Sequence, residues 1–171
     1  MKRLVILGGG ESGVGTAQLG KAKGFQVFVS DFGSIKENLR SELSENTIEF
    51  EEKGHSTDRI LRSDLVIKSP GIPNEAPIIQ SIKNKGIWML SEIEFASRFS
   101  NAKTICITGS NGKTTTTTLT HKLISEAGFS CSISGNIGNS FSSVCEEHVD
   151  FSIVEVSSFQ LDRVENFKPH I

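Results

Sequence analysis

The stretch TICITGSNGKTTTTTLTHKL, Thr104 to Leu123, decides the fold class of this protein. An apolar segment runs into a Gly-Lys-Thr step and then into an amphipathic segment that begins with five consecutive threonines. Threonine forms helices poorly, so this run gives up roughly 1–2 kcal/mol of helix stability. A strand, a glycine-rich turn and a helix start rich in hydroxyl and free N–H groups together predict a phosphate-binding loop.

This loop is shorter than the common pattern G-x-x-x-x-G-K-[ST]. Ile107 stands where that pattern has its first glycine, and Gly109 supplies the early glycine instead. Backbone N–H groups around the loop can still surround a phosphate, Lys113 can place its charge against terminal phosphates, and the Thr114 hydroxyl can bind Mg²⁺. The predicted ATP-binding residues are Gly109, Ser110, Asn111, Gly112, Lys113, Thr114 and Thr115.

An acidic residue, Glu155, closes the apolar segment 150–156 that follows this loop in the chain. Nucleotide-binding sheets place a second metal-binding group at such a position, so we predict that Thr114 and Glu155 both face the metal. The alternative is an acid that only caps the following segment, SSFQL.

The remaining chain alternates short apolar runs with amphipathic segments. Continuous apolar strands of this kind are typical of a parallel sheet covered on both faces, so the fold class is α/β. We expect strands over residues 4–7, 25–30, 64–68, 86–90, 104–108, 131–134 and 150–156. We expect helices over residues 13–23, 35–43, 57–61, 75–85, 91–99, 113–127 and 139–147.

A second glycine-rich turn, GGGESG, follows the first expected strand. Gly8, Gly10 and Gly13 fit the G-x-G-x-x-G pattern, and Asp31 ends the next strand. Glycines there let a pyrophosphate approach a helix N-terminus, and the acid can accept hydroxyls of a sugar. Glu11 would repel that pyrophosphate unless its carboxylate points away. A tight turn without a ligand and an NAD-binding fingerprint are the alternatives.

Two such turns about a hundred residues apart predict two domains. We place the boundary in the polar segment 98–103, with a Rossmann-like parallel-sheet domain over residues 1–97 and an incomplete P-loop ATPase-type α/β domain over residues 98–171. About seventy residues are few for a nucleotide-binding sheet. The sequence FKPHI ends as an apolar segment begins, so we expect a fragment of a longer protein.

Composition limits the classes of partner. The chain has 171 residues, 36% of them hydrophobic, with a net charge of -2, which favours a globular protein and excludes a basic nucleic-acid binder. Three widely spaced cysteines predict reduced packing residues, and four histidines in polar segments suggest no chemistry. No apolar run approaches 20 residues, so we expect a cytoplasmic protein without a membrane partner.

The strings SPGIP (69–73), ITGSNGKTTT (107–116), SGNIG (134–138) and EVSSFQL (155–161), after a G-x-G-x-x-G turn, resemble the Mur ligases of peptidoglycan synthesis. The resemblance covers essentially the whole chain. It implies three domains: one that binds UDP and not NAD, a central ATPase and a domain for the incoming amino acid. The substrate-binding residues that it implies are Ser12, Gly13, Asp31, Phe32, Ser69, Gly71, Asn136 and Ser157.

The implied activity is ATP- and Mg²⁺-dependent amide-bond formation through an acyl phosphate, with Lys113 and Glu155 as catalytic residues. SSFQL favours the member that adds D-glutamate to UDP-N-acetylmuramoyl-L-alanine, a step of cell-wall synthesis on which cell shape and division depend. We expect a monomer that is inactive as this chain alone. At position 32 this sequence has phenylalanine, whereas the Mur ligases commonly have a small polar residue there, beside the uracil. The rival hypotheses are an NAD-binding oxidoreductase and a non-catalytic nucleotide-binding module.

Overall fold

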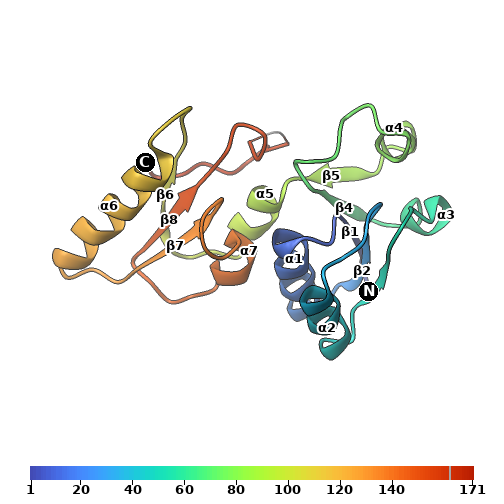
Figure 1. Cartoon of the computed structure of the whole chain (residues 1–171), viewed down its shortest axis with the longest axis horizontal. Helices are drawn as coiled ribbons and strands as arrows, with labels where there is room; N and C mark the ends of the chain where they lie inside the picture. Colours follow the sequence, from blue (N-terminus) through green and yellow to red (C-terminus); the bar gives the residue numbers. More distant parts are fainter. Residues whose placement is uncertain (162) are drawn as a thin grey trace.

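The computed structural model describes residues 1–161 and 163–171 and contains two parallel β-sheets (Figure 1). The first sheet has the order β3-β2-β1-β4-β5 and the second the order β6-β8-β7. Their strands are β1 (Arg3–Leu7), β2 (Gln26–Ser30), β3 (Glu49–Glu51), β4 (Leu65–Lys68), β5 (Trp88–Leu90), β6 (Lys103–Ile107), β7 (Cys131–Gly135) and β8 (Phe151–Glu155). All pairings are parallel, which confirms the α/β class.

Each connection between paired strands contains a helix. The helices are α1 (Glu11–Ala22), α2 (Glu37–Glu45), α3 (Thr57–Ile60), α4 (Pro77–Asn84), α5 (Glu92–Ser97), α6 (Lys113–Glu126) and α7 (Phe141–Val144). The seven expected strands and seven expected helices are present, with two corrections. The short edge strand β3, which carries two glutamates, was not predicted, and α7 is a single turn over Phe141–Val144 in place of the helix expected over residues 139–147.

The first sheet is covered on both faces, as its apolar strands predict. Leu4 and Ile6 of β1 point into one buried cluster with residues of α1, α2 and α5. Val5 and Leu7, one position further along, point into a second cluster with residues of α3 and α4. Successive strand residues face opposite sides, so one strand supplies both cores.

Helices α1, α5 and α7 lie between the two sheets (Figure 1). Phe141 and Cys145 of the α7 segment and Val154 of β8 belong to the same buried cluster as α1 and α5. The hydroxyls of Thr16 and Ser142 lie 3.0 Å apart across this contact. The apolar core is therefore continuous between the two sheets, and the domain boundary at residues 97–98 stays a proposal.

Glu94 of α5 fastens the C-terminal segment to the linker between the sheets. Its buried Oε2 accepts backbone N–H groups of Glu165, Asn166 and Phe167 at 2.9–3.0 Å, and its Oε1 accepts a hydrogen bond from Arg98 at 2.9 Å. Burial alone would raise the pKa of Glu94, but these hydrogen bonds outweigh burial and hold the pKa below its ordinary value.

The cysteines are free thiols. Burial raises the pKa of Cys145 to about 12 and that of Cys106 to about 11, so neither forms a thiolate readily at neutral pH. This agrees with their expected role in packing.

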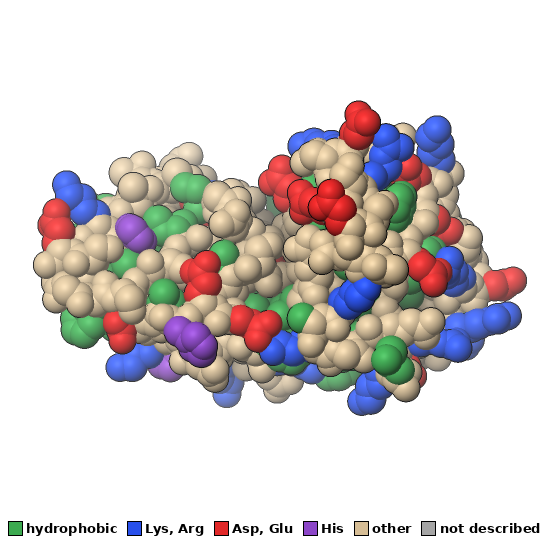
Figure 2. All heavy atoms as spheres, turned by 90° about the horizontal axis from the view of Figure 1, so that it is seen from below, with side chains coloured by type: hydrophobic (Ala, Val, Ile, Leu, Met, Phe, Trp, Pro, Cys, Tyr) green, Lys and Arg blue, Asp and Glu red, His purple; other side chains and the backbone are tan. Residues whose placement is uncertain are grey.

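Acidic and basic side chains are interspersed over the face shown in Figure 2. That pattern matches the small net charge of -2. None of the helices in the described ranges has the length and apolar character that crossing a bilayer requires.

Candidate functional site

The first glycine-rich turn joins β1 to α1 at the carboxyl end of the sheet. A Cβ at Gly13 would lie 2.0 Å from the Gly8 carbonyl oxygen, so only glycine allows the helix this close to the strand end. Asp31, after β2, accepts the N–H of Gly9 at 2.6 Å and the N–H of Gly33 at 2.7 Å. One carboxylate thus links the turn to the loop that follows β2.

A cleft of about 460 Å³ opens at this turn, and both halves of the chain contribute to it. It contains six of the eight predicted substrate-binding residues: Ser12, Gly13, Asp31, Ser69, Asn136 and Ser157. Phe32 and Gly71 do not line it. Phe32 is 76% exposed beside the cleft residue Asp31, and Gly71 follows the lining residue Pro70.

Glu11, in the first glycine-rich turn, has a basic side chain beside it. Its carboxylate lies 3.7 Å from the ammonium group of Lys36, and both side chains are about 70% exposed. Lys36 also lines the cleft. The cation partly offsets the repulsion that the sequence predicts between Glu11 and a pyrophosphate.

The second glycine-rich turn has the geometry of a phosphate loop. Gly112 adopts the left-handed conformation with φ 77° directly before α6, which few other residues allow. Lys113 turns back along the loop and donates to the Gly109 carbonyl at 2.8 Å. This hydrogen bond and the left-handed Gly112 hold the loop in a tight curve.

Thr114 and Glu155 meet at the start of α6. The Thr114 hydroxyl donates to Glu155 Oε2 at 2.9 Å, and Glu155 is only 2% exposed. Asn136 donates through its side chain to Glu155 Oε1 at 3.4 Å and through its backbone to the Glu155 carbonyl at 2.9 Å. Because Asn136 also lines the cleft, one amide connects the cleft with the phosphate loop.

The donor set fits Mg²⁺. A carboxylate and a hydroxyl are hard oxygen ligands, and Mg²⁺ commonly takes only one or two protein ligands, with phosphates and water for the rest. Among the described residues there is no group of three His, Cys, Asp or Glu side chains that could hold a metal without such help. Thr114 and Glu155 would hold the ion, which would neutralise charge on transferring phosphates.

The threonine run divides into two roles. Thr114 reaches Glu155, while Thr117 is fully buried and faces the interior. Thr118 donates its hydroxyl to the Thr114 carbonyl at 2.8 Å. The small β-branched side chains therefore serve both the loop and the packing of α6.

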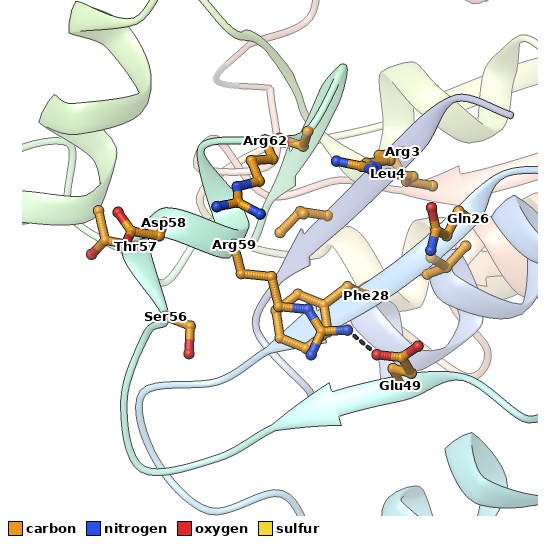
Figure 3. A pocket seen from close by; sticks show the side chains of 13 residues that line it. Arg3, Leu4, Gln26, Phe28, Glu49, Ser56, Thr57, Asp58, Arg59 and Arg62 are labelled. Carbon is orange, nitrogen blue, oxygen red and sulfur yellow. Dashed lines mark hydrogen bonds and ion pairs between the residues drawn. The ribbon is translucent and has the colours of Figure 1, made fainter.

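A second cavity, of about 800 Å³, lies at the opposite end of the strands of the first sheet (Figure 3). It is bordered by Arg3, Gln26 and Glu49, the first residues of three strands. The guanidinium group of Arg59 lies 3.6 Å from the Phe28 ring centre and pairs with Glu49. Ligands of α/β sheets bind at carboxyl ends of strands, and both glycine-rich turns lie there, so we place the candidate site in the smaller cleft.

Two residues that line the cleft, Glu92 and Gln160, were not predicted as site residues. Glu92 accepts the backbone N–H of Ser142 at 2.6 Å. Glu92 follows the N-cap of α5, a position without a motif. Two of the four histidines have hydrogen-bond partners: His55 Nδ1 lies 2.7 Å from the Ser30 hydroxyl oxygen, and His170 Nδ1 accepts the Thr104 N–H at 3.1 Å.

Comparisons with known proteins agree with this geometry. A model of the MurD N-terminal domain matches residues 3–78, and a model of the Mur ligase middle domain matches residues 107–171. The chain is 53% identical, over its whole length, to UDP-N-acetylmuramoylalanine--D-glutamate ligase of Bacteroides thetaiotaomicron and covers 39% of that protein. The corresponding ligase of Christiangramia forsetii is also 53% identical over 99% of the chain, which covers 38% of it.

A solved murein peptide ligase of Psychrobacter arcticus shares the fold, with a TM-score of 0.64 at 20% identity, over 99% of this chain and 42% of that one. The parallel sheets, the glycine-rich turns and the acid facing the phosphate loop are typical of a nucleotide-binding α/β protein. Its sequence relatives specify which one: the chain belongs to the Mur ligase family. It spans about 39% of the length of the relatives that it matches.

Proposed function

We propose that residues 1–97 bind the UDP-linked substrate and residues 98–171 bind the phosphates of ATP in a cytoplasmic ligase that joins D-glutamate to UDP-N-acetylmuramoyl-L-alanine. The relatives, which are UDP-N-acetylmuramoylalanine--D-glutamate ligases, support this substrate pair. The observation that carries the proposal is the position of Asn136, which lines the cleft and also holds Glu155 beside the phosphate loop. A UDP-linked carboxylate and a terminal phosphate could therefore approach each other there.

In such a ligase the γ-phosphoryl group of ATP passes to the alanyl carboxylate, and the amine of D-glutamate then displaces phosphate to form the amide. Bound Mg²⁺ would neutralise the charge that develops on the phosphoryl oxygens. Lys113 adds a second positive charge at the same loop. Ser12, Asp31, Ser69 and Ser157 bind and orient the UDP-linked substrate, so that its carboxylate is held near the loop.

The rival oxidoreductase hypothesis explains only the first glycine-rich turn. It gives no role to a phosphate loop whose threonine donates to a buried glutamate. A non-catalytic nucleotide-binding module would use the same contacts, and the relatives favour the ligase over it.

Binding by the whole chain tests the proposal directly. We expect UDP to shift the backbone amide resonances of Glu11 to Val14, Asp31 and Ser69, and MgATP to shift those of Asn111 to Thr115. NAD should shift neither set at the same concentration. Tight NAD binding without a response to UDP would overturn the assignment of the cleft.

A further inference from the structure

The cavity at the amino ends of the strands of the first sheet is lined by three arginines (Figure 3). Arg3 begins β1, Arg59 lies in α3, and Arg62 lies in the turn that follows α3. The volume of about 800 Å³ is in the range of pockets that hold small organic ligands. The proposed ligase site lies at the other end of these strands and gives this cavity no role.

Backbone hydrogen bonds hold the segments of Arg3 and Arg62 together. Asp64 donates its backbone N–H to the Arg3 carbonyl at 3.0 Å, and its carboxylate accepts the Arg3 N–H at 2.7 Å. Arg62 lies two positions before Asp64, and its own N–H donates to the Arg59 carbonyl at 3.2 Å. The two chain segments that carry the Arg3 and Arg62 guanidinium groups are therefore fixed beside each other.

The charges of Arg3 and Arg62 are not matched by acids of the cavity. Among residues 1–161 and 163–171, neither guanidinium group has an ion-pair or hydrogen-bond partner. The two acids that line the cavity are Glu49, which pairs with Arg59, and Asp58. Figure 3 shows the Asp58 carboxylate directed away from Arg3 and Arg62. Two such guanidinium groups favour an anion, because their paired N–H groups match the oxygens of a carboxylate or phosphate.

Arg59 adds a flat surface to this cavity. Its guanidinium group lies over the Phe28 ring, 3.6 Å from the ring centre, and the ion pair with Glu49 fixes its orientation. The side chain of Arg59 is 47% exposed, so the face turned away from Phe28 stays accessible. A guanidinium group is planar and stacks on aromatic rings, so this second face suits a ring of the ligand.

We propose that this cavity is a second ligand site, which takes a small planar anion. The phosphate or carboxylate group of the ligand binds Arg3 and Arg62, and its ring lies on Arg59. Phe28, Arg59 and the ligand ring then form a stack of three layers. Phosphates and carboxylates offer the same paired oxygens, so the test uses one probe of each kind.

Nuclear magnetic resonance of the whole chain with phenyl phosphate and with benzoate tests the site. Both probes should shift the backbone amides of Thr57 to Ser63 and the Nε–H resonances of Arg59 and Arg62 in a saturable way. The amides of Glu11 to Val14, in the candidate cleft, should not move. The probe that binds more tightly identifies the acid group that the site prefers.

Two further probes separate the ring from the charge. Inorganic phosphate lacks the ring and should bind roughly three- to tenfold more weakly than phenyl phosphate, the loss of one contact with a guanidinium face. Benzyl alcohol lacks the charge and should bind roughly ten- to hundredfold more weakly.

Substitutions assign these contacts to residues. Arg3→Gln and Arg62→Gln should each weaken phenyl phosphate binding roughly tenfold, because each removes a charged donor. Arg59→Lys keeps the charge and removes the flat surface, so phenyl phosphate should then bind no more tightly than inorganic phosphate. Arg40→Gln is the matched control: Arg40 is an exposed arginine of α2 that lies 3.4 Å from Glu52, and its loss should leave both affinities unchanged.

Four results would overturn the second ligand site. These are the absence of saturable shifts at Thr57 to Ser63 with either probe, shifts confined to Glu11 to Val14, wild-type affinity in both Arg3→Gln and Arg62→Gln, and an equal loss in Arg40→Gln. The last result would mean that net charge alone attracts the anion. Wild-type preference for phenyl phosphate over inorganic phosphate in Arg59→Lys would overturn the stacking role of Arg59.

Discussion

The hydroxyl of Thr114, in the first turn of α6, donates a hydrogen bond of 2.9 Å to the carboxylate of Glu155, the last residue of β8. The sequence separates the two by 41 positions. Their contact brings two oxygen ligands together at the first turn of α6, where free backbone N–H groups favour a phosphate. Nucleotide and metal should therefore bind there in a coupled manner.

Removing the metal-facing carboxylate tests this coupling. Mg²⁺ should tighten ATP binding to the wild-type chain, and this tightening should disappear in Glu155→Gln, because the amide cannot supply a charged ligand. Calorimetric titration with and without Mg²⁺ measures it. Thr118→Val is the control, since the Thr118 hydroxyl donates to the Thr114 carbonyl and its loss should leave the Mg²⁺ effect intact. A full Mg²⁺ effect in Glu155→Gln would remove Glu155 from the metal site.

Lys113→Ala should weaken ATP binding by about 10- to 100-fold, because a hydrogen bond to a charged group contributes roughly 1.5–3 kcal/mol. AMP binding should change far less, since AMP lacks the terminal phosphates. Fluorescence titration of both nucleotides gives the ratio. Lys122→Ala, an exposed change on the same helix, should alter neither affinity. Equal losses for ATP and AMP would contradict a specific role for Lys113 at the terminal phosphates.

Glu94→Gln should lower the free energy of unfolding by roughly 1.5–3 kcal/mol at pH 7, because three backbone N–H groups and Arg98 lose a charged acceptor. The folded-state pKa of Glu94 is lowered, so its contribution is complete above the unfolded pKa near 4.5 and is lost as pH falls through the folded pKa. Urea unfolding at pH 7 and at lower pH measures both effects.

The control for that change is Glu126→Gln, an exposed glutamate 3.8 Å from Lys122 on α6. Such surface pairs contribute little, so its effect should stay below about 1 kcal/mol. Equal stability of Glu94→Gln and the wild-type chain from pH 7 downward would show that Glu94 does not fasten the C-terminal segment.

Glu92 should show the opposite pH dependence. Burial raises its pKa, although the backbone and side-chain hydrogen bonds with Ser142 lower it in part. Its Oε2 has no hydrogen-bond partner among the residues that the structure describes. A raised folded-state pKa means that the unfolded chain ionises first, so stability is lost as pH rises above about 4.5.

Glu92→Gln should therefore gain stability relative to the wild-type chain as pH rises from 5 to 8, because the amide does not ionise. Urea unfolding of the two proteins across that range measures the difference. A difference that does not change with pH would mean that Glu92 ionises as easily in the folded chain as in the unfolded one.

The sequence by itself determined the α/β class, the two glycine-rich turns and the residues of the phosphate loop. These features depend on local chemistry: apolar runs form buried strands, glycines allow close turns, and Lys113 and Thr114 follow such a turn directly. The short edge strand β3 was missed because Phe50 is its single apolar residue, flanked by two glutamates.

Only the tertiary structure decided how the parts of the site meet. Asn136, which lines the cleft, donates a hydrogen bond to Glu155. Glu94 accepts backbone N–H groups of the segment 165–167, and the His55 ring lies against the Phe32 ring. Each of these contacts joins segments that are far apart in the sequence or separated by a turn, so no residue spacing in the sequence predicts the contact. They arise because parallel strands bring their carboxyl ends to one edge of a sheet, and because a continuous core sets one sheet beside the other.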